Sequence, residues 1–314
     1  MITIPPEFLK EEERDGFLIP ETMKRAWAVQ LTLLDQVLEI AKRHGLTVFM
    51  DYGSVLGAVR HHGYIPWDDD LDICLKRKDY MRLLDALEKE LPPETKVYSF
   101  YNTEDYRQPK AFVANRAVID IGIDPKEAEL THKSFDCPYS TGIDICPLDY
   151  VPADEDQFNL IRQIYIAIYD LAMRMDTFIA QGEFEDYLSQ IEEILNVSVK
   201  RDENIRTSLW KLADKVAMMT TREEAGALMW YPATAIRPTD MRLPLSAYKR
   251  AIWVDFEFTK VPIPEGYDDF LRILYGEDYM TPRFALSAHE YPFYKIQDKK
   301  ILHNSKIGQL CDVF

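Results

Sequence analysis

Four aspartates lie close together in the segment Ile65-Pro-Trp-Asp-Asp-Asp-Leu-Asp72. Asp70 and Asp72 are one residue apart, so a strand here places both carboxylates on one face. Leu71 and Ile73 then occupy the other face. Two carboxylates on one face repel each other unless a cation lies between them. Because Mg²⁺ binds through one or two carboxylates together with substrate phosphates, the pair predicts a divalent-metal site for phosphoryl transfer.

A third aspartate has the same kind of setting. Asp144 alternates with apolar residues in Gly142-Ile-Asp-Ile-Cys-Pro147. A carboxylate in a buried strand needs a partner, and a metal ion shared with Asp70 and Asp72 would supply one. The alternative for the run of aspartates at 68–70 is a solvated loop, and for Asp144 it is an edge strand that faces water.

The pair Gly53-Ser54 precedes a short apolar segment that ends at Arg60. This pattern is typical of a turn into a helix, where backbone N–H groups and the helix dipole favour an anion. We therefore expect Gly53 and Ser54 to hold a phosphate, with ordinary N-capping by Ser54 as the alternative. Arg60 and Arg77 are further candidates for a phosphate contact.

Aromatic residues are frequent near the acidic segment, and Trp67 adjoins it directly. Such rings can enclose a quaternary ammonium group by cation–π attraction. Packing in the core is the alternative use of Trp67.

The composition limits the classes of function. The chain has 314 residues, of which 47% are hydrophobic, enough for one large domain or two smaller ones. A net charge of -16 argues against binding to nucleic acid or anionic lipid. The four cysteines form no CxxC pair, which argues against a zinc site. Without a signal-peptide pattern or a bilayer-length apolar run, we expect a cytoplasmic protein without a transmembrane segment that acts near the inner membrane face.

Periodicity and turn residues predict an α/β (α+β) fold, with a mixed sheet, flanking helices and a helical insertion. The predicted helices cover 21–44, 54–60, 79–91, 154–180, 184–195, 205–219 and 267–275. The predicted strands cover 47–51, 71–75, 96–100, 112–119, 142–147, 228–231 and 251–258, and 122–141 is expected to be irregular. We expect a catalytic core at 1–151, a helical segment at 152–226 and a C-terminal α+β segment at 227–314 that packs on the core.

Several of these motifs resemble the LicD family, and the block from Ile65 to Asp72 is the most specific of them. The similar stretches begin at about residue 45 and end at about 290, and residues 154–225 carry none. They are Gly53–Arg60, Gly63–Ile73, Arg77–Tyr80, Gly142–Pro152, Val261–Pro264 and Tyr267–Met280, with Pro282, Arg283 and His289. The resemblance implies a nucleotidyltransferase-like fold and transfer of a phosphorylated alcohol from a CDP-alcohol to a glycan hydroxyl, with release of CMP.

The resemblance also implies roles for individual residues. Asp70, Asp72 and Asp144 become catalytic residues and ligands of Mg²⁺ or Mn²⁺, and Gly53 and Ser54 become the phosphate turn. Further substrate contacts are expected from Trp67, Asp68, Tyr80, Arg283 and His289.

The family's named activity is phosphocholine transfer from CDP-choline to teichoic acid or lipopolysaccharide, so CDP-choline is the first choice of donor. A glycan or lipid-linked glycan is the expected acceptor. The alternatives are transfer of phosphoethanolamine, ribitol phosphate or glycerol phosphate, a nucleotidyltransferase that transfers NMP from an NTP, and a noncatalytic binding protein.

Overall fold

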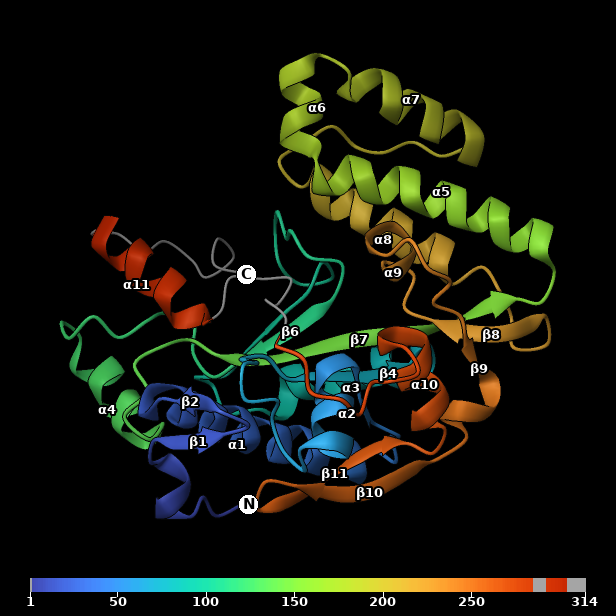
Figure 1. Ribbon diagram of the computed structural model, residues 1–314. Helices are drawn as coiled ribbons and strands as arrows, with labels where there is room; N and C mark the ends of the chain where they lie inside the picture. Colours follow the sequence, from blue (N-terminus) through green and yellow to red (C-terminus); the bar gives the residue numbers. More distant parts are fainter. Residues whose placement is uncertain (1, 285–291, 304–314) are drawn as a thin grey trace. The chain divides into compact units, whose positions relative to one another are not determined.

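The computed structural model describes residues 2–284 and 292–303, and these form two compact units (Figure 1). The first unit holds the chain up to Val97, Phe112–Ile145 and the described residues from Arg250 onward. The second unit holds Tyr98–Ala111 and Cys146–Lys249. The chain therefore enters each unit more than once, whereas the sequence suggested consecutive segments.

The first unit has a mixed α+β architecture. Its strands follow the order β3-β4-β7-β6-β5, and β3 pairs with β4 in antiparallel orientation. These strands are β3 (Phe49–Met50), β4 (Asp72–Lys76), β5 (Lys96–Tyr98), β6 (Ala111–Ala114) and β7 (Gly142–Pro152). Two hairpins accompany them, β1 (Glu12–Arg14) with β2 (Phe17–Ile19) and β10 (Ala251–Phe256) with β11 (Thr259–Pro264).

The helices of the first unit are η1 (Pro6–Leu9), α1 (Glu21–Arg43), α2 (Tyr52–Arg60), α3 (Arg77–Glu90), α4 (Pro125–Lys133), α10 (Tyr267–Tyr275) and α11 (Phe293–His303). The longest, α1, follows Pro20 and buries an apolar stripe that includes Trp27, Leu31 and Leu34. Its end near Gly45, which has a φ of +63°, agrees with the sequence prediction.

The second unit is built on helices around a short sheet. Here β7 pairs from Asp149 onward with β8 (Ala225–Met229), which pairs with β9 (Leu243–Pro244). The helices are α5 (Glu155–Met173), α6 (Met175–Gln181), α7 (Phe184–Leu195), α8 (Ile205–Ala217), α9 (Ala233–Ile236) and η2 (Leu245–Tyr248). Helix α5 packs on α8, where the Tyr169 and Trp210 rings meet edge to face at 5.5 Å. Together the two units show the expected α+β nucleotidyltransferase-like fold.

Three sequence predictions about these elements were wrong. Strand β7 continues past Pro147 to Pro152. Its pairing with β8 begins only at Asp149. Pro147 has no N–H, but it therefore removes no hydrogen bond to β8. The segment 122–141 contains α4, whose start is marked by the N-cap Asp124 and by Pro125. The helix predicted over 154–180 is interrupted at Arg174, which separates α5 from α6.

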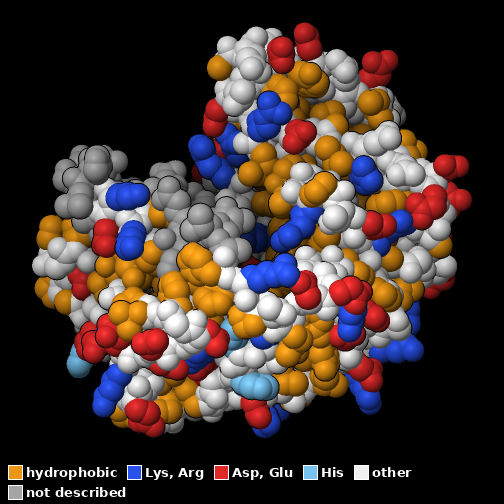
Figure 2. Space-filling view, viewed as in Figure 1, with side chains coloured by type: hydrophobic (Ala, Val, Ile, Leu, Met, Phe, Trp, Pro, Cys, Tyr) orange, Lys and Arg blue, Asp and Glu red, His pale blue; other side chains and the backbone are white. Residues whose placement is uncertain are grey.

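The surface agrees with the acidic composition. Figure 2 shows basic side chains interspersed with acidic ones on the viewed face, without a broad field of Lys and Arg. Within residues 2–284 and 292–303, no helix combines the length and the apolar character needed to cross a bilayer.

Candidate active site

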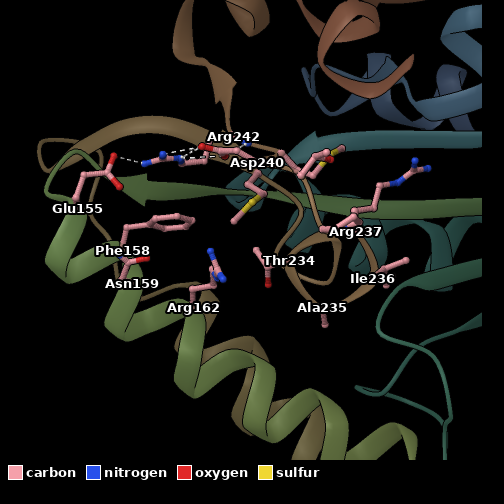
Figure 3. A pocket seen from close by; sticks show the side chains of 14 residues that line it. Glu155, Phe158, Asn159, Arg162, Thr234, Ala235, Ile236, Arg237, Asp240 and Arg242 are labelled. Atoms are coloured by element: carbon pink, nitrogen blue, oxygen red, sulfur yellow. Dashed lines mark hydrogen bonds and ion pairs between the residues drawn. The ribbon is translucent and has the colours of Figure 1, made fainter. Parts of the chain in front are cut away.

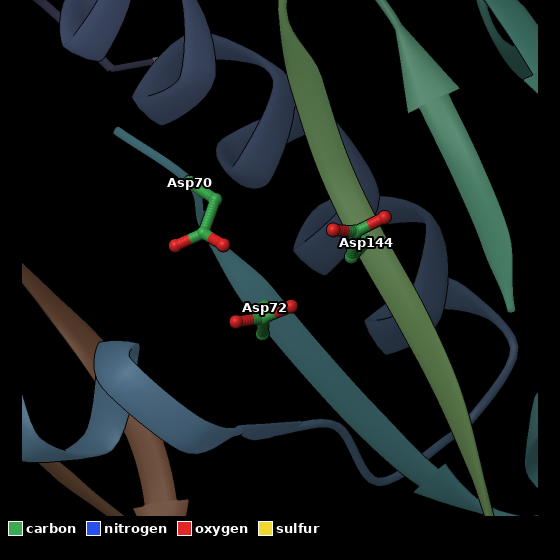
Figure 4. Close-up of side chains that lie close together, drawn as sticks. All are labelled: Asp70, Asp72 and Asp144. Atoms are coloured by element: carbon green, nitrogen blue, oxygen red, sulfur yellow. The ribbon is translucent and has the colours of Figure 1, made fainter. Parts of the chain in front are cut away.

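Three aspartates converge in the first unit (Figure 4). Asp70 lies just before β4, Asp72 begins β4, and Asp144 lies on the neighbouring strand β7. Each offers a carboxylate oxygen, and these oxygens lie within 4.8 Å of one another. The backbone N–H of Asp144 donates to the carbonyl of Leu71 at 3.0 Å, which holds the two strands together beside the cluster. The structure thus brings together the three carboxylates that the sequence pattern singled out.

The chemistry of this cluster fits a hard divalent cation. Carboxylate oxygens are the ligands that Mg²⁺ and Mn²⁺ prefer. Asp72 is only 7% exposed, so its charge is poorly solvated and gains much from a counter-charge. Burial, and then the charge of Asp70, raise the pKa of the adjacent Asp68 carboxyl well above its usual range. The excess of negative charge is therefore concentrated at the point where the strands meet.

Ser54 positions the first residue of β4. Its Oγ accepts a hydrogen bond from the backbone N–H of Asp72 at 2.9 Å. It does not cap α2, because the helix begins at Tyr52 and the capping carboxylate is that of Asp51, which accepts from the Tyr52 N–H. The capping alternative considered for Ser54 is therefore wrong, and the hydroxyl instead connects α2 to the acidic strand.

Gly53 provides space for an acidic side chain. A Cβ at this position would lie 2.6 Å from Oδ2 of Asp68. A side chain at residue 53 would therefore push the Asp68 carboxyl away from the first turn of α2. The steric reason for a glycine here is this close approach. Its backbone conformation is not the reason, because the φ of Gly53 is not in the left-handed region.

Helix α1 fixes the backbone of the acidic segment, a role that the sequence analysis missed. The Trp27 indole N–H donates to the carbonyl of Asp68 at 3.1 Å. The Gln30 amide donates to the carbonyl of Asp69 at 2.8 Å and to Oγ1 of Thr141 at 3.1 Å. A signal was present, because Gln30 is a polar residue on the apolar stripe of a predicted helix and a buried amide needs partners.

The turn between β10 and β11 supports the loop that leads into the acidic segment. Glu257 accepts from the backbone N–H of Tyr64 at 2.9 Å and from the Arg14 guanidinium at 2.8 and 3.0 Å. A Cβ on Gly63 would lie 2.2 Å from Glu257 Oε1, so a side chain there would displace the Glu257 carboxylate. No local pattern could have identified Glu257, since it contacts residues about two hundred positions earlier in the chain.

The two arginines proposed for phosphate contacts have different surroundings. Arg60 donates to the carbonyl of Tyr279 at 2.8 Å and to Nε2 of His61 at 2.9 Å, so it ties α2 to the segment after α10. Arg77 begins α3, and its guanidinium carbon lies 5.4 Å from the centroid of the Tyr80 ring. Tyr80 itself is fully buried and has no surface for a substrate contact.

Two of the remaining substrate candidates have contacts of other kinds, and the third is not described. Trp67 is half-buried and packs edge-on against Phe17, His61 and Phe284, with ring centroids 5.6 to 6.1 Å from its own. Arg283 is exposed and forms an ion pair with Asp278. His289 lies outside the described residues.

We expect His61 to make the free energy of unfolding decrease in acid. Its Nε2 accepts from Arg60, and its Nδ1 lies 3.0 Å from Asp15. Burial and then the Arg60 charge lower the pKa of His61 below its usual 6.5. The unfolded chain therefore binds more protons below about pH 6.5, and the free energy of unfolding falls as the pH drops through that range.

Urea unfolding between pH 7.5 and 5.5 measures this effect. We expect the His61→Gln protein to lose less stability over this range than the wild type. His62→Gln provides the control, because His62 is the exposed neighbour. We expect this variant to keep the wild-type dependence of stability on pH. A wild-type slope in His61→Gln would show that other groups cause the acid sensitivity.

The chain is similar to known proteins over the segment that contains α2 and β4. Residues 45–142 match the family model described as LicD/FKTN/FKRP, nucleotidyltransferase domain. The lipopolysaccharide cholinephosphotransferase LicD of Haemophilus influenzae is 32% identical over 83 residues, which are 26% of this chain and 29% of that protein. An uncharacterized protein of Rickettsia prowazekii is 38% identical over 55 residues, which are 18% of this chain and 21% of its own.

The matched segments thus span less than a third of each relative. The family match covers α2, the acidic segment and β4, and it reaches the first residue of β7. Two of the three converging aspartates lie inside it, and Asp144 follows two residues after its end. Over residues 45–142, the chain is therefore similar to the nucleotidyltransferase domain of the LicD family.

Proposed function

We propose that this protein transfers a phosphorylated alcohol, with phosphocholine as the first choice, from a CDP-alcohol to a hydroxyl group of a glycan. The observation that carries the proposal is the convergence of Asp70, Asp72 and Asp144 beside α2. The choice of phosphocholine rests on the similarity to a protein named as a lipopolysaccharide cholinephosphotransferase.

In the proposed reaction, the acceptor oxygen attacks the phosphorus that carries the alcohol, and the bond from that phosphorus to CMP breaks. Mg²⁺ or Mn²⁺ held by the three aspartates would neutralise the pyrophosphate and the leaving CMP. Asp144 is half-buried on β7 and is our choice for the group that takes the proton of the acceptor hydroxyl. CMP leaves with the bonding electron pair, so the step is balanced.

The start of α2 is our choice for a donor phosphate contact. Asp51 accepts from the N–H groups of Tyr52, Ser54 and Val55. The N–H of Gly53 lies in the same first turn, where no earlier helical carbonyl can accept it. It therefore offers a donor at the positive end of the helix, beside the acidic cluster.

The donor preference is tested by calorimetry with Mg²⁺ and a panel of CDP-choline, CDP-ethanolamine, CDP-ribitol and CDP-glycerol. We expect CDP-choline to bind most tightly, because a quaternary ammonium is recognised by aromatic faces. If Trp67 supplies such a face, Trp67→Leu weakens CDP-choline by roughly 2- to 30-fold, equivalent to about 0.5–2 kcal/mol, and leaves CMP unchanged.

Trp253 provides a matched control, because it is 57% exposed on β10 and its replacement by Leu should change neither ligand. An equal loss of CDP-choline and CMP in Trp67→Leu would assign the ring to packing, in line with its three ring neighbours. Absence of binding by every CDP-alcohol would reject the proposed donor class.

A nucleotidyltransferase is the second candidate, and the description of the matching family model favours it. The two reactions differ in the group that remains on the acceptor. CDP-choline labelled either in the choline or in the cytidine separates them, provided that a glycan acceptor is supplied. Retention of the choline label supports the proposed function, whereas transfer of labelled NMP from an NTP supports the alternative.

A further inference from the structure

The second unit contains a cavity of about 660 Å³ whose charges balance each other (Figure 3). Arg242 donates to Glu155 at 2.6 Å and to Asp240 at 2.6 Å. The hydrogen bonds from Arg242, together with the charges of Arg242 and Arg162, hold the pKa of Asp240 below its usual value. In Figure 3 the Arg237 side chain turns away from the hollow. The cavity therefore has no excess charge that would select a ligand.

By contrast, the acidic segment of the first unit makes a specific contact with helix α11. The backbone N–H of Phe293, the first residue of α11, donates to Oδ2 of Asp69 at 2.6 Å. The first N–H groups of a helix have no partner within the helix, and the helix dipole favours an anionic side chain beside them. Asp69 is 3% exposed, so this bond replaces water that its carboxylate has lost. The residue immediately before Asp70 therefore anchors α11.

One helical turn further along, α11 contacts the segment that leads into β7. The Gln297 side chain accepts from the backbone N–H of Ser140 at 3.2 Å and donates to its carbonyl at 2.6 Å. Both residues are completely buried. Asp298 accepts from the hydroxyl of Tyr139 at 3.0 Å, which adds another bond between the same two segments. Because Ser140 shortly precedes Asp144 in the chain, α11 holds the segment in front of the third aspartate.

Helix α11 thus connects the two segments that carry the candidate metal ligands. Gln30 of α1 makes a second connection between them, because it donates both to the carbonyl of Asp69 and to Oγ1 of Thr141. Mg²⁺ requires its ligands at short distances and in a nearly fixed geometry, so a small shift of one strand weakens its binding. Groups that orient metal ligands from outside the coordination shell typically contribute about 10- to 100-fold to metal affinity.

We propose that Asp69 and Gln297 are positioning residues, which act through α11 to hold the third aspartate at the distance from the other two that a divalent cation requires. The inference rests on the proposed function, because it concerns the same candidate metal site. Neither residue needs to contact the ion. Since Gln30 still connects the two segments when α11 is released, loss of one anchor of α11 should weaken binding of the cation without abolishing it.

Replacing Gln297 by Leu tests the proposal without a change of charge. Gln297→Leu removes both hydrogen bonds to Ser140 and keeps a side chain of similar size. We expect the dissociation constant for Mn²⁺, measured from the EPR signal of the free ion, to rise about tenfold. Gly45→Ala is the control for lost stability, because its φ of +63° strains a side chain but a Cβ there meets nothing within 4 Å. It should melt at a lower temperature than the wild type in EDTA, yet bind Mn²⁺ equally tightly.

Asp69 is tested by two variants that lose the same charge. Asp69→Asn keeps a side-chain oxygen that can accept from the N–H of Phe293, whereas Asp69→Ala does not. We expect Asp69→Ala to bind Mn²⁺ about tenfold more weakly than Asp69→Asn. Equal loss of affinity in the two variants would mean that Asp69 acts through its charge or as a direct ligand, and would overturn its role as an anchor.

Cleavage by trypsin gives a readout that a merely structural role of α11 would not change. Lys295 and Lys299 are exposed on α11, and cleavage after them requires the helix to leave its docked position. If docking of α11 favours the cation, the cation favours docking by the same factor. Mn²⁺ should therefore slow both cleavages in the wild type and have no effect on them in Asp72→Asn. Cleavage after Lys200, which is exposed in the second unit, should not depend on Mn²⁺.

The outcomes separate this inference from the proposed function. If the wild type binds no Mn²⁺, the proposed metal site fails and the positioning role fails with it. If Mn²⁺ binds to the wild type but not to Asp72→Asn, and Gln297→Leu binds it as tightly as the wild type, the metal site stands and the positioning role is overturned. Cleavage of α11 that does not respond to Mn²⁺ overturns it as well. The two Asp69 variants and the wild-type cleavage decide the question if Gln297→Leu does not fold.

Discussion

Replacing Asp72 by Asn is expected to abolish transfer while leaving the fold intact. Asp72 is one of three carboxylates whose oxygens lie within 4.8 Å, and it is the most buried of them. Loss of its charge removes several kcal/mol of charge stabilisation at the reacting phosphate, which corresponds to about a 10³-fold loss of rate. Asp70→Asn should behave in the same way. Release of CMP in Mg²⁺ measures the effect.

Metal-dependent stability gives a second readout that does not need the substrate. A ligand at a hundred times its dissociation constant stabilises the folded state by about 2.7 kcal/mol, so Mg²⁺ or Mn²⁺ should raise the wild-type melting temperature. Asp72→Asn should lose this shift, yet in EDTA it should be at least as stable as the wild type, because one of three mutually repelling charges is gone.

The control for both measurements is Asp85→Asn, since Asp85 is exposed on α3 and pairs only with Lys89 among the contacts described. It should keep both the activity and the metal-dependent shift. Full turnover by Asp72→Asn in Mg²⁺, or an unchanged shift, would exclude the proposed metal site.

Gly142→Ala is expected to destabilise the protein by about 3 kcal/mol or more, at the upper end of the range for overpacked cores. A Cβ on Gly142 would lie 1.9 Å from the carbonyl oxygen of Val113 and 2.7 Å from the Phe112 ring. The first of these belongs to the backbone of β6, which cannot rotate away as a side chain would. Strands β6 and β7 would have to separate, and Asp144, two residues further on, would move with β7. Urea unfolding and the transfer assay should therefore both report a loss.

Gly45→Ala separates this steric effect from the general cost of replacing a glycine. Gly45 has a φ of +63°, but a Cβ there meets nothing within 4 Å. We expect about 1–2 kcal/mol of backbone strain in Gly45→Ala and no effect on activity. If Gly142→Ala were no less stable than Gly45→Ala, the close packing of β7 on β6 would not be the cause.

Local sequence patterns were sufficient to predict those features that depend on residues close together in the chain. The apolar stripe of α1 and the start of α10 follow from helical periodicity and from flanking Pro and Gly. The nearness of the Asp70 and Asp72 carboxylates agrees with their spacing of two residues, although only Asp72 lies in β4. Even there the boundaries shifted, since β4 begins at Asp72 and α2 begins at Tyr52.

Contacts between distant segments could not be derived in this way. The position of β7 beside β4 brings Asp144 to the other two aspartates, and it depends on which strands pair in the whole sheet. Similarly, Ser54 accepts from the backbone of Asp72, and Glu257 supports the loop before it from the far end of the chain. Each of these hydrogen bonds satisfies a polar group that burial has removed from water. Which groups become buried depends on how the whole chain packs.

The sequence by itself therefore singled out the residues of the candidate site: two aspartates one residue apart, a third aspartate in an apolar strand, and a glycine-serine pair near a helix start. Only the tertiary structure decided that these groups meet, that α1 and the β10–β11 turn hold the acidic segment in place, and that α11 connects this segment to the one before β7. The physical reason is that side-chain alternation is a property of a few consecutive residues, whereas strand order and burial arise from packing of the whole chain.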